Sequence, residues 1–427
     1  MKLRIERPIY GGAGLARHEG KAIFVPFTLP GELVEAHVTE DHRSYADAEL
    51  EGILEASPHR TQAPCPYFGE CGGCHYQHAT YSHQPEIKIQ ILRETLQRAR
   101  LSEVPEIMPL CGEPLGYRNR IRLHIDRTSS KLSYKRRASH QNLRVDVCPI
   151  AAPILQNAIQ SLQAASQSLQ LCQNFAETEL FTNSAQDQIL LTLWSSGNPQ
   201  SASHKLYTLW PQLQSRIPKL TGAAVLSSER GTQQSRPLAQ IGERALNYSV
   251  ANHEYRVSIG SFFQVNRFLL DPLVELVANA SSGRAAWDLY AGVGLFSAAL
   301  AANFEQVVAV ESAPSSVQDL RHNLHGRPHR VVASTTLDFL QRTRRSKEES
   351  PDLVIVDPPR TGLGKGVTTL LADVRPALIT YVSCDPATLS RDLKSLLDSG
   401  YHLNSMRMVD LFPQTFHLES VATLSLR

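Results

Sequence analysis

The chain has 427 residues, which at roughly 150 residues per domain predicts about three domains. Apolar residues make up 42% and charged residues 20%, and 43 Lys and Arg against 41 Asp and Glu leave a net charge of +2. This balance excludes a disordered polyelectrolyte and a uniformly polybasic coat, so a charged binding surface must be local. No apolar run is long enough to span a bilayer, and Arg4, Glu6 and Arg7 interrupt any signal-peptide core, so we expect a cytoplasmic protein with no membrane partner.

Residues 1–60 contain short strand-like runs separated by turns, which predicts a small OB-like β-barrel. The glycine-rich run 11–14 lies between two of these strands. Because a strand and not a helix follows it, we interpret this run as a hairpin turn rather than a phosphate loop. Barrels of this class often bind RNA or oligosaccharides, but the strand pattern leaves a purely structural cap equally open.

Residues 61–260 are expected to form a central α+β domain. Its most informative feature is a C-x5-C-x2-C run made by Cys65, Cys71 and Cys74, with Cys148 followed by a proline further on. Seven cysteines in a chain without an export signal favour metal or catalytic roles over disulfides. Four thiolates suit either tetrahedral zinc or an iron-sulfur cluster, and the cysteine-proline pair and adjacent glycines favour the cluster.

The rest of this region predicts an amphipathic helix over residues 85–100, with apolar residues at helical spacing. Residues 115–145 predict two strands that carry nine Lys and Arg against the single acid Asp126. This local basic surface fits RNA phosphates, although a solvated sheet face would have the same composition. Residues 150–255 carry no recognisable site motif.

Residues 261–427 alternate apolar strands with helical segments, which predicts a Rossmann-like α/β domain with a parallel sheet. Gly292 and Gly294 lie between a strand and a helix, where backbone must pass close to a ligand, and Glu311 ends the next strand, where a carboxylate can accept ribose hydroxyls. The third glycine of the dinucleotide fingerprint is absent, which favours S-adenosylmethionine over NAD. A plain strand-to-helix turn is the alternative.

Two further segments follow strands at the same predicted edge of the sheet. Asp357-Pro-Pro-Arg comes directly after an apolar strand, and prolines stiffen the backbone there. Cys384 lies between another strand and a helix, where the helix dipole favours a thiolate. An ordinary loop and an inert thiol are the alternatives, and the convergence of these segments on one edge argues against them.

These motifs together resemble the RNA uracil-C5 methyltransferases, specifically the iron-sulfur branch that acts on 23S rRNA. The similarity covers nearly the whole chain: the amino-terminal segment resembles a TRAM domain, and PCPYFGECGGC with Cys148 resembles the family's 4Fe-4S site. SFFQVN, DLYAGVGLF, VDPPRTGLG, YVSCDPATLSRD and LFPQTFHLESV follow in the family's order.

The resemblance implies S-adenosyl-L-methionine and a 4Fe-4S cluster as cofactors, and RNA as partner of a monomeric enzyme. It also implies roles for the site residues: Cys384 as nucleophile, Glu419 as base, and contacts to the methyl donor from Gln264, Tyr290, Glu311 and Asp357. The thiolate would add to carbon 6 of uracil so that carbon 5 becomes nucleophilic enough to accept the methyl group. The target base would be flipped out and stacked on aromatic side chains of the Phe262-Phe263 kind, which are core residues in the alternative interpretation.

Three positions depart from the family's pattern. Leu295 stands where many relatives have a polar residue, and Ser334 stands near a common acidic adenine contact, so adenine recognition is less defined than ribose recognition. Asp385 follows the nucleophile in place of Asn, where its charge would raise the pKa of the thiol. Two other functions stay open: a tRNA uracil-C5 methyltransferase with the same mechanism, and a non-catalytic iron-sulfur RNA-binding protein.

Overall fold

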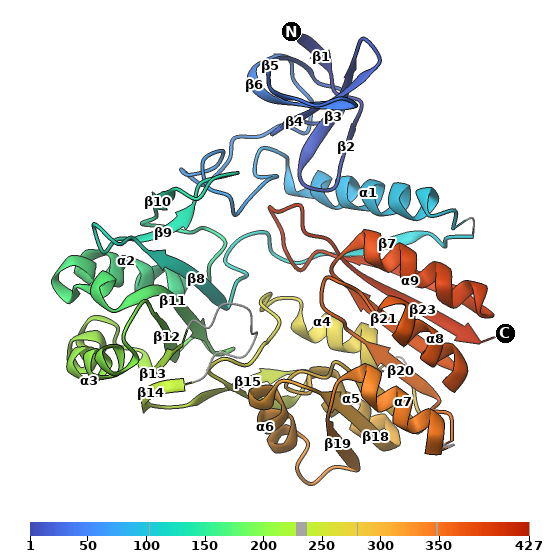
Figure 1. Cartoon of the computed structure of the whole chain (residues 1–427). Helices are drawn as coiled ribbons and strands as arrows, with labels where there is room; N and C mark the ends of the chain where they lie inside the picture. The colour runs from blue at the N-terminus through green and yellow to red at the C-terminus, as the bar shows by residue number, and fades with distance from the viewer. Residues whose placement is uncertain (102, 228–236, 280, 347–348, 427) are drawn as a thin grey trace.

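Figure 1 shows the computed structural model, which describes residues 1–101, 103–227, 237–279, 281–346 and 349–426. The α/β class predicted from the sequence is confirmed, with an all-β amino-terminal unit, a central α+β unit and a carboxyl-terminal α/β unit. Within the described ranges, no helix is long and apolar enough to cross a membrane.

The amino-terminal unit is a curled six-stranded sheet with the order β1-β5-β6-β4-β3-β2. Alternating side chains such as Leu3, Ile5, Ile23 and Val25 point into a small core of their own. Gly11 and the residue after it have positive φ and form the turn between β2 and β3, as the hairpin interpretation predicts. The strands are β1 (Lys2–Arg4), β2 (Arg7–Pro8), β3 (Ala13–His18), β4 (Lys21–Pro26), β5 (Leu33–Asp41) and β6 (Tyr45–Glu55).

The central unit is a seven-stranded sheet with the order β10-β9-β8-β11-β12-β13-β14, and two amphipathic helices pack on it. Both helices begin with proline at an amino-terminal position, where its missing N–H group has no intrahelical partner to lose. The elements are β8 (Arg120–Ile125), β9 (Leu132–Lys135), β10 (Asn142–Arg144), α2 (Pro153–Leu169), β11 (Phe175–Thr182), β12 (Ile189–Ser195), α3 (Pro199–Arg216), β13 (Leu220–Leu226) and β14 (Pro237–Gly242).

The carboxyl-terminal unit is an eight-stranded sheet with the order β19-β18-β17-β20-β21-β23-β22-β7. Strands β19, β18, β17, β20 and β21 run parallel, so their carboxyl ends meet at one edge. The elements are α4 (Leu270–Val274), β17 (Gly283–Leu289), α5 (Leu295–Asn303), β18 (Phe304–Glu311), α6 (Pro314–Asn323), β19 (His329–Ala333), α7 (Thr336–Ser346), β20 (Leu353–Val356), α8 (Gly364–Val374), β21 (Leu378–Ser383), α9 (Pro386–Asp398), β22 (Tyr401–Val409) and β23 (Glu419–Leu426).

Several elements from the expected central range 61–260 pack on the carboxyl-terminal unit. Helix α1 (Gln84–Arg98), the predicted amphipathic helix, covers one face of the eight-stranded sheet together with α7, α8 and α9. Strand β7 (Ile107–Leu110) extends that sheet, and the hairpin of β15 (Ala245–Val250) and β16 (His253–Ser258) packs against α5 and α6 on the other face. The three-way division at residues 60 and 260 stays a prediction.

Candidate active site

The turn after β17 has a backbone that glycine makes possible. Tyr290, Gly292 and Gly294 have φ of 71°, 57° and 93°. These values lie in the left-handed region, which glycine adopts readily and other residues adopt rarely. A Cβ on Gly294 would lie 2.7 Å from Leu320 Cδ1, whereas one on Gly292 would meet nothing within 4 Å. The turn therefore brings bare backbone to the amino terminus of α5, where N–H groups can approach a ligand.

Two acidic residues flank this turn. The Glu311 carboxylate at the end of β18 accepts hydrogen bonds from Gly292 N at 2.9 Å and from the two backbone N–H groups that follow it at 2.6 Å each. Asp288 accepts a hydrogen bond from Ser297 Oγ, while its Oδ1 is buried without a hydrogen-bond partner among the described residues. Burial, with a smaller contribution from Glu311, raises the pKa of Asp288 to about 7.

Asp357 lies directly after β20, at the edge reached by the glycine turn. Gln264 Nε2 lies 3.4 Å from Asp357 Oδ2, which brings a segment before α4 to the same place. Burial and the Asp288 carboxylate raise the pKa of Asp357 to about 7. The structure thus gathers acidic groups from two neighbouring strands into a region with little water, which is unfavourable for anions unless a cation joins them.

Cys384 and Glu419 lie at the same edge of the sheet, at the end of β21 and the start of β23. Ser383 ends β21 and pairs antiparallel with Ser420 of β23, so Cys384, which follows β21, and Glu419, which begins β23, come one step beyond this pair. Glu419 is only 3% exposed, and Cys384 is half-buried. The register itself therefore places the thiol beside the carboxyl, because partners in an antiparallel pair lie about 5 Å apart between Cα atoms.

The charges around Cys384 oppose its ionisation. Burial raises the pKa of the Cys384 thiol to about 12, with further contributions from the Glu419 and Asp357 carboxylates, while Arg360 acts in the opposite direction. Burial and Asp357 also raise the pKa of Glu419 well above its ordinary value. The expectation that the helix dipole favours the thiolate is thus outweighed, and the thiol is protonated in the free protein.

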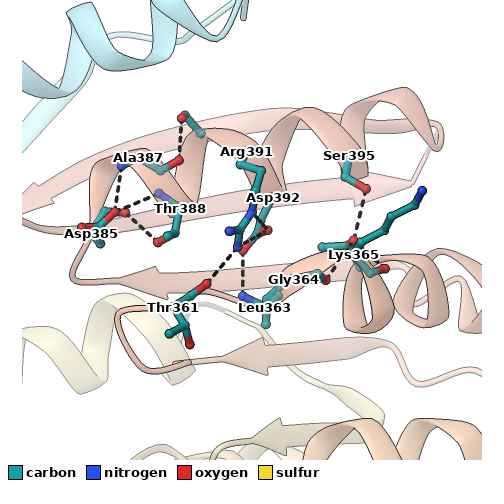
Figure 2. A network of polar contacts seen from close by, with 12 residues as sticks. Thr361, Leu363, Gly364, Lys365, Asp385, Ala387, Thr388, Arg391, Asp392 and Ser395 are labelled. Atoms are coloured by element: carbon teal, nitrogen blue, oxygen red, sulfur yellow. Dashed lines mark hydrogen bonds and ion pairs between the residues drawn. The ribbon is translucent and has the colours of Figure 1, made fainter.

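Asp385 has a different role from the expected repulsion of the thiolate. Its carboxylate caps helix α9 by accepting hydrogen bonds from the backbone N–H groups of Ala387 and Thr388 at 3.0 and 2.9 Å. The Thr388 hydroxyl in turn donates to the Arg360 carbonyl at 3.2 Å. Figure 2 shows the two contacts of the Asp385 carboxylate with Ala387 and Thr388. Together with the bond from Thr388 to Arg360, they tie the residue after Cys384 to the segment after Asp357.

The same two segments are joined a second time by Asp392 of α9. Its Oδ2 accepts hydrogen bonds from Leu363 N at 2.7 Å and from the Tyr381 hydroxyl at 2.9 Å. The neighbouring Arg391 donates to the Thr361 carbonyl at 2.9 Å and to Asp392 Oδ1 (Figure 2). Because Asp392 is buried with its lone pairs satisfied, this network fixes the loop before α8 against the helix that follows Cys384.

Sequence reasoning missed the residues that hold the loop before Glu419. The side chain of Gln84 in α1 forms two hydrogen bonds with Gln414. It donates to the side-chain oxygen of Gln414 and accepts from its backbone N–H, at 2.9 Å each. Lys88 of α1 forms a buried ion pair with Asp410 at 2.6 Å. The sequence offered one signal for these contacts, a polar Gln and Lys on the otherwise apolar face of the amphipathic helix.

The cysteine thiols of the metal hypothesis lie close enough to interact electrostatically. The pKa of the Cys74 thiol is raised to about 12, first by burial and then by the thiols of Cys148, Cys71 and Cys65. Burial raises the pKa of the other three thiols as well. Across the described ranges, no three cysteine Sγ atoms lie within 4.8 Å of one another.

Comparison with known proteins places the chain in a family. The family model described as tRNA (uracil-5-)-methyltransferase matches residues 80–427, and the TRAM domain model matches residues 1–50. The chain belongs to the RNA uracil-C5 methyltransferases. It is therefore an S-adenosylmethionine-dependent RNA methyltransferase with an amino-terminal TRAM domain, and RNA is its substrate class.

Curated relatives match over nearly their whole length. The chain is 32% identical to an uncharacterized RNA methyltransferase of Aquifex aeolicus, covering 100% of this chain and 99% of that protein. It is 30% identical to the 23S rRNA (uracil(1939)-C(5))-methyltransferase RlmD of Shewanella amazonensis, covering 99% and 95%. The crystal structure of Pyrococcus abyssi tRNA (uracil-54, C5)-methyltransferase in complex with S-adenosyl-L-homocysteine has the same fold, with a TM-score of 0.78 at 24% identity over 99% of this chain and 100% of that chain.

The positions that depart from the family's pattern have structural partners in this methyltransferase. Leu295 is buried at the start of α5, in the apolar core of the domain. Ser334 N donates to the Glu311 carbonyl at 3.0 Å, and Arg342 donates to the Ser334 hydroxyl. Both side chains thus have contacts within the protein.

The two phenylalanines before Gln264 differ in environment. Phe263 is buried in the core, 4.9 Å between ring centroids from Tyr248, which matches the core interpretation. Phe262 is 64% exposed, although it is large and apolar. Of this pair, only Phe262 is available to stack on a base.

The basic strands expected to bind RNA are partly neutralised by acids from another strand. Arg122 of β8 pairs with Glu177 of β11 and also stacks over the Trp194 ring at 3.7 Å from its centroid. Arg120 lies 3.8 Å from Glu179 of the same strand. The run of basic residues therefore overstates the charge of this surface, because the acids that face it come from a distant part of the sequence.

Proposed function

We propose that this enzyme transfers a methyl group from S-adenosylmethionine to carbon 5 of a uridine in 23S rRNA. In this proposal Cys384 forms a covalent adduct with carbon 6 of the uracil, and Glu419 removes the carbon 5 proton. The observation that carries it is the strand register that sets Cys384 and Glu419 side by side at the end of β21 and β23, next to Asp357. A nucleophile and a base on the same rim as the methyl donor are what this reaction needs.

The steps balance without an additional reactant. With cofactor and RNA bound, the Cys384 thiol loses its proton to solvent and the thiolate adds to carbon 6, and the uracil ring becomes an enolate whose carbon 5 attacks the methyl group of the sulfonium. S-adenosylhomocysteine leaves, and carbon 5 now holds both the methyl group and its original proton. Glu419 takes that proton, the carbon 5–carbon 6 double bond forms again, and the Cys384 thiolate is released.

The raised pKa values support a cationic cofactor. Burial and neighbouring carboxylates raise the pKa values of Asp288 and Asp357 to about 7 and also raise that of Glu419, so the protein itself supplies little positive charge to this site. A sulfonium placed among these groups would stabilise their ionised forms and make the Cys384 thiolate more accessible. After methyl transfer the cofactor is S-adenosylhomocysteine, a neutral thioether that no longer stabilises the ionised carboxylates. This loss favours its release.

The cofactor-binding roles follow from position. We assign the backbone of Gly292 and Gly294 to close approach to S-adenosylmethionine, and Glu311 to the ribose, because its Oε2 faces the turn through Gly292 N. The remaining contacts are assigned to Gln264, Tyr290 and Asp357, which surround the same edge of the sheet.

We further propose that Cys65, Cys71, Cys74 and Cys148 hold a 4Fe-4S cluster. Burial raises the pKa of all four thiols, and Cys148 raises the pKa of the other three further, which is an arrangement that a metal centre relieves. A tetrahedral zinc with Zn–S bonds of about 2.3 Å would bring its sulfurs to about 3.8 Å apart. No three of these Sγ atoms lie that close among the described residues, and the preference for a cubane, whose ligands bind separate irons, rests on the cysteine-proline pair and the adjacent glycines of the sequence. When bound, the cluster would supply a crosslink between residues 65–74 and the strand region before residue 148, and a redox couple.

The choice of 23S rRNA rests on the relatives named for that substrate, and tRNA is the alternative. Exposed Phe262 beside Gln264 supports a flipped-out target base in either RNA. A non-catalytic RNA-binding role is the third candidate, and the juxtaposition of Cys384 and Glu419 argues against it.

In vitro methylation separates these candidates. Unmodified 23S rRNA and a pool of unmodified tRNA are each incubated with the protein and S-adenosylmethionine, and nucleosides are analysed by mass spectrometry. We expect 5-methyluridine in 23S rRNA with the native protein and none with Cys384→Ala. Product in tRNA alone would select the alternative substrate, and no product in either RNA would support the non-catalytic role.

A further inference from the structure

The turn between β2 and β3 carries a tyrosine out of the TRAM barrel toward the catalytic domain. Gly11 and Gly12, with φ of 109° and 93°, reverse the chain directly after Tyr10. Arg7 at the start of β2 forms an ion pair with Glu94 of α1, which anchors this hairpin to the catalytic domain. Figure 1 shows the hairpin descending from the barrel toward α1 and the loop before β23.

The turn between β2 and β3 packs against the loop that leads to Glu419. The Tyr10 ring packs edge-on against Phe416, with ring centroids 5.4 Å apart. A Cβ on Gly12 would lie 2.9 Å from His75 Cβ, so the turn is in close contact with His75, which itself packs on Phe416 at 4.6 Å. Tyr10 and Gly12 of the turn therefore both contact this region, and any side chain at position 12 would push the turn away from His75.

Short contacts connect Phe416 of this loop to the catalytic groups. Phe416 packs on His417 with ring centroids 4.4 Å apart, and His417 Nδ1 lies 3.3 Å from Arg360 Nη2. The Tyr10 phenol also interacts electrostatically with Cys384, Glu419 and Arg360. Tyr10 of the TRAM unit thus shares the electrostatic environment of the catalytic groups.

The Tyr10 hydroxyl is suited to donate a hydrogen bond. Burial is the main cause that raises its pKa to about 12, so the phenol is protonated at neutral pH. The half-buried Tyr10 makes no side-chain hydrogen bond within the described residues, and its ring packs on Phe416. A positioned donor near catalytic groups that has no acceptor among the described residues is typical of a group whose acceptor is the substrate.

We propose that Tyr10 positions the target nucleotide, its hydroxyl donating a hydrogen bond to an oxygen of the flipped-out uridine nucleotide. The TRAM barrel then supplies one wall of the catalytic pocket in addition to any binding of RNA elsewhere. This inference rests on the proposed function, since it needs a uridine to enter the pocket. Tyr10 is a positioning residue, because the covalent chemistry belongs to Cys384 and Glu419.

The test compares two substitutions of Tyr10 with one matched control. Tyr10→Phe removes the hydroxyl and keeps the ring on Phe416, while Tyr10→Ala removes both. Tyr45→Phe removes a hydroxyl from another tyrosine of the same barrel, which stacks on His42 at 4.4 Å between ring centroids. Steady-state methylation is measured on unmodified rRNA and on the shortest fragment of it that the native enzyme methylates, with S-adenosylmethionine saturating.

Loss of one hydrogen bond to substrate predicts that Tyr10→Phe lowers kcat/KM about three- to tenfold. The loss should be the same on the long and the short RNA, because the contact is to the target nucleotide itself. The melting temperature and the affinity for S-adenosylmethionine should be those of the native enzyme, and Tyr45→Phe should be unchanged in all assays. A fragment with 4-thiouridine at the target position should crosslink on irradiation to a peptide that contains residue 10.

Two results would overturn the inference. In the first, Tyr10→Phe has the same kcat/KM as Tyr45→Phe, while Tyr10→Ala is impaired. This result would mean that Tyr10 contributes only packing. The other is crosslinking that never reaches residue 10 while the native enzyme methylates the same fragment. Failure of the native enzyme to methylate any RNA would instead refute the proposed function, so the two failures are distinguishable.

Discussion

The protonation state of Cys384 gives a quantitative prediction for the RNA-free enzyme. A pKa of about 12 leaves roughly 1 in 10⁴ of the thiol ionised at pH 8, against about 1 in 10 for a thiol with a pKa of 9. The thiolate with the higher pKa is intrinsically more nucleophilic, by about 20-fold over three pKa units. Together these effects predict alkylation of Cys384 roughly 50-fold slower than that of a small free thiol at pH 8.

Iodoacetamide labelling followed by peptide mass spectrometry measures this rate for Cys384 alone, with N-acetylcysteine as reference. The rate should rise about tenfold per pH unit from pH 7 to pH 10, because the thiolate fraction does so below its pKa. Arg360→Ala should slow labelling further, since Arg360 lowers the pKa of the thiol, and Arg360→Lys should retain most of the native rate. A plateau near pH 9, or labelling as fast as the free thiol at pH 8, would refute the reasoning.

Three further predictions follow from the same site and from the cysteine cluster. Glu419→Gln should accumulate protein joined covalently to methylated RNA, seen as a denaturation-resistant band that nuclease shortens, because a base of this kind supplies typically about 10²- to 10⁴-fold; native turnover without the band would exclude Glu419 as the base. In chemical denaturation, Gly294→Ala should lower the free energy of unfolding by roughly 2–5 kcal/mol and also weaken S-adenosylmethionine binding, since its Cβ would clash with Leu320. Gly292→Ala should lower the free energy of unfolding by only about 1–2 kcal/mol, and equal effects of the two substitutions would contradict the geometry. Protein purified without oxygen should be brown with about four irons per chain, Cys74→Ser should lose the iron, and stoichiometric zinc without iron would contradict the cluster.

Much of the catalytic domain could be predicted from the sequence because its signals are local. Apolar strands that alternate with helices indicate a parallel sheet, and residues directly after such strands must meet at one edge, as Gly292, Asp357 and Cys384 do. The amino-terminal β-unit and the amphipathic helix α1 followed in the same way from the spacing of apolar residues and turns, whereas the TRAM assignment followed from the family resemblance.

What sequence reasoning missed depends on contacts between distant segments. Arg122 belongs to a strongly basic run, but its partner Glu177 is contributed by a strand 55 residues later. The helix after Cys384 suggests an easily ionised thiol, yet burial and the carboxylate of Glu419 reverse the direction of its pKa shift. Tyr10 resembles any other residue of a hairpin turn, and its place beside the catalytic groups follows only from how the barrel docks on Phe416.

The central claim is that this enzyme makes 5-methyluridine in 23S rRNA through Cys384. Its most direct test is mass-spectrometric mapping of methylated nucleosides in rRNA from cells that lack the protein, complemented with the native chain or with Cys384→Ala. The proposed function predicts that one 5-methyluridine disappears from 23S rRNA, returns with the native chain and stays absent with Cys384→Ala. An unchanged set of 5-methyluridines in 23S rRNA, or full restoration by Cys384→Ala, would contradict it.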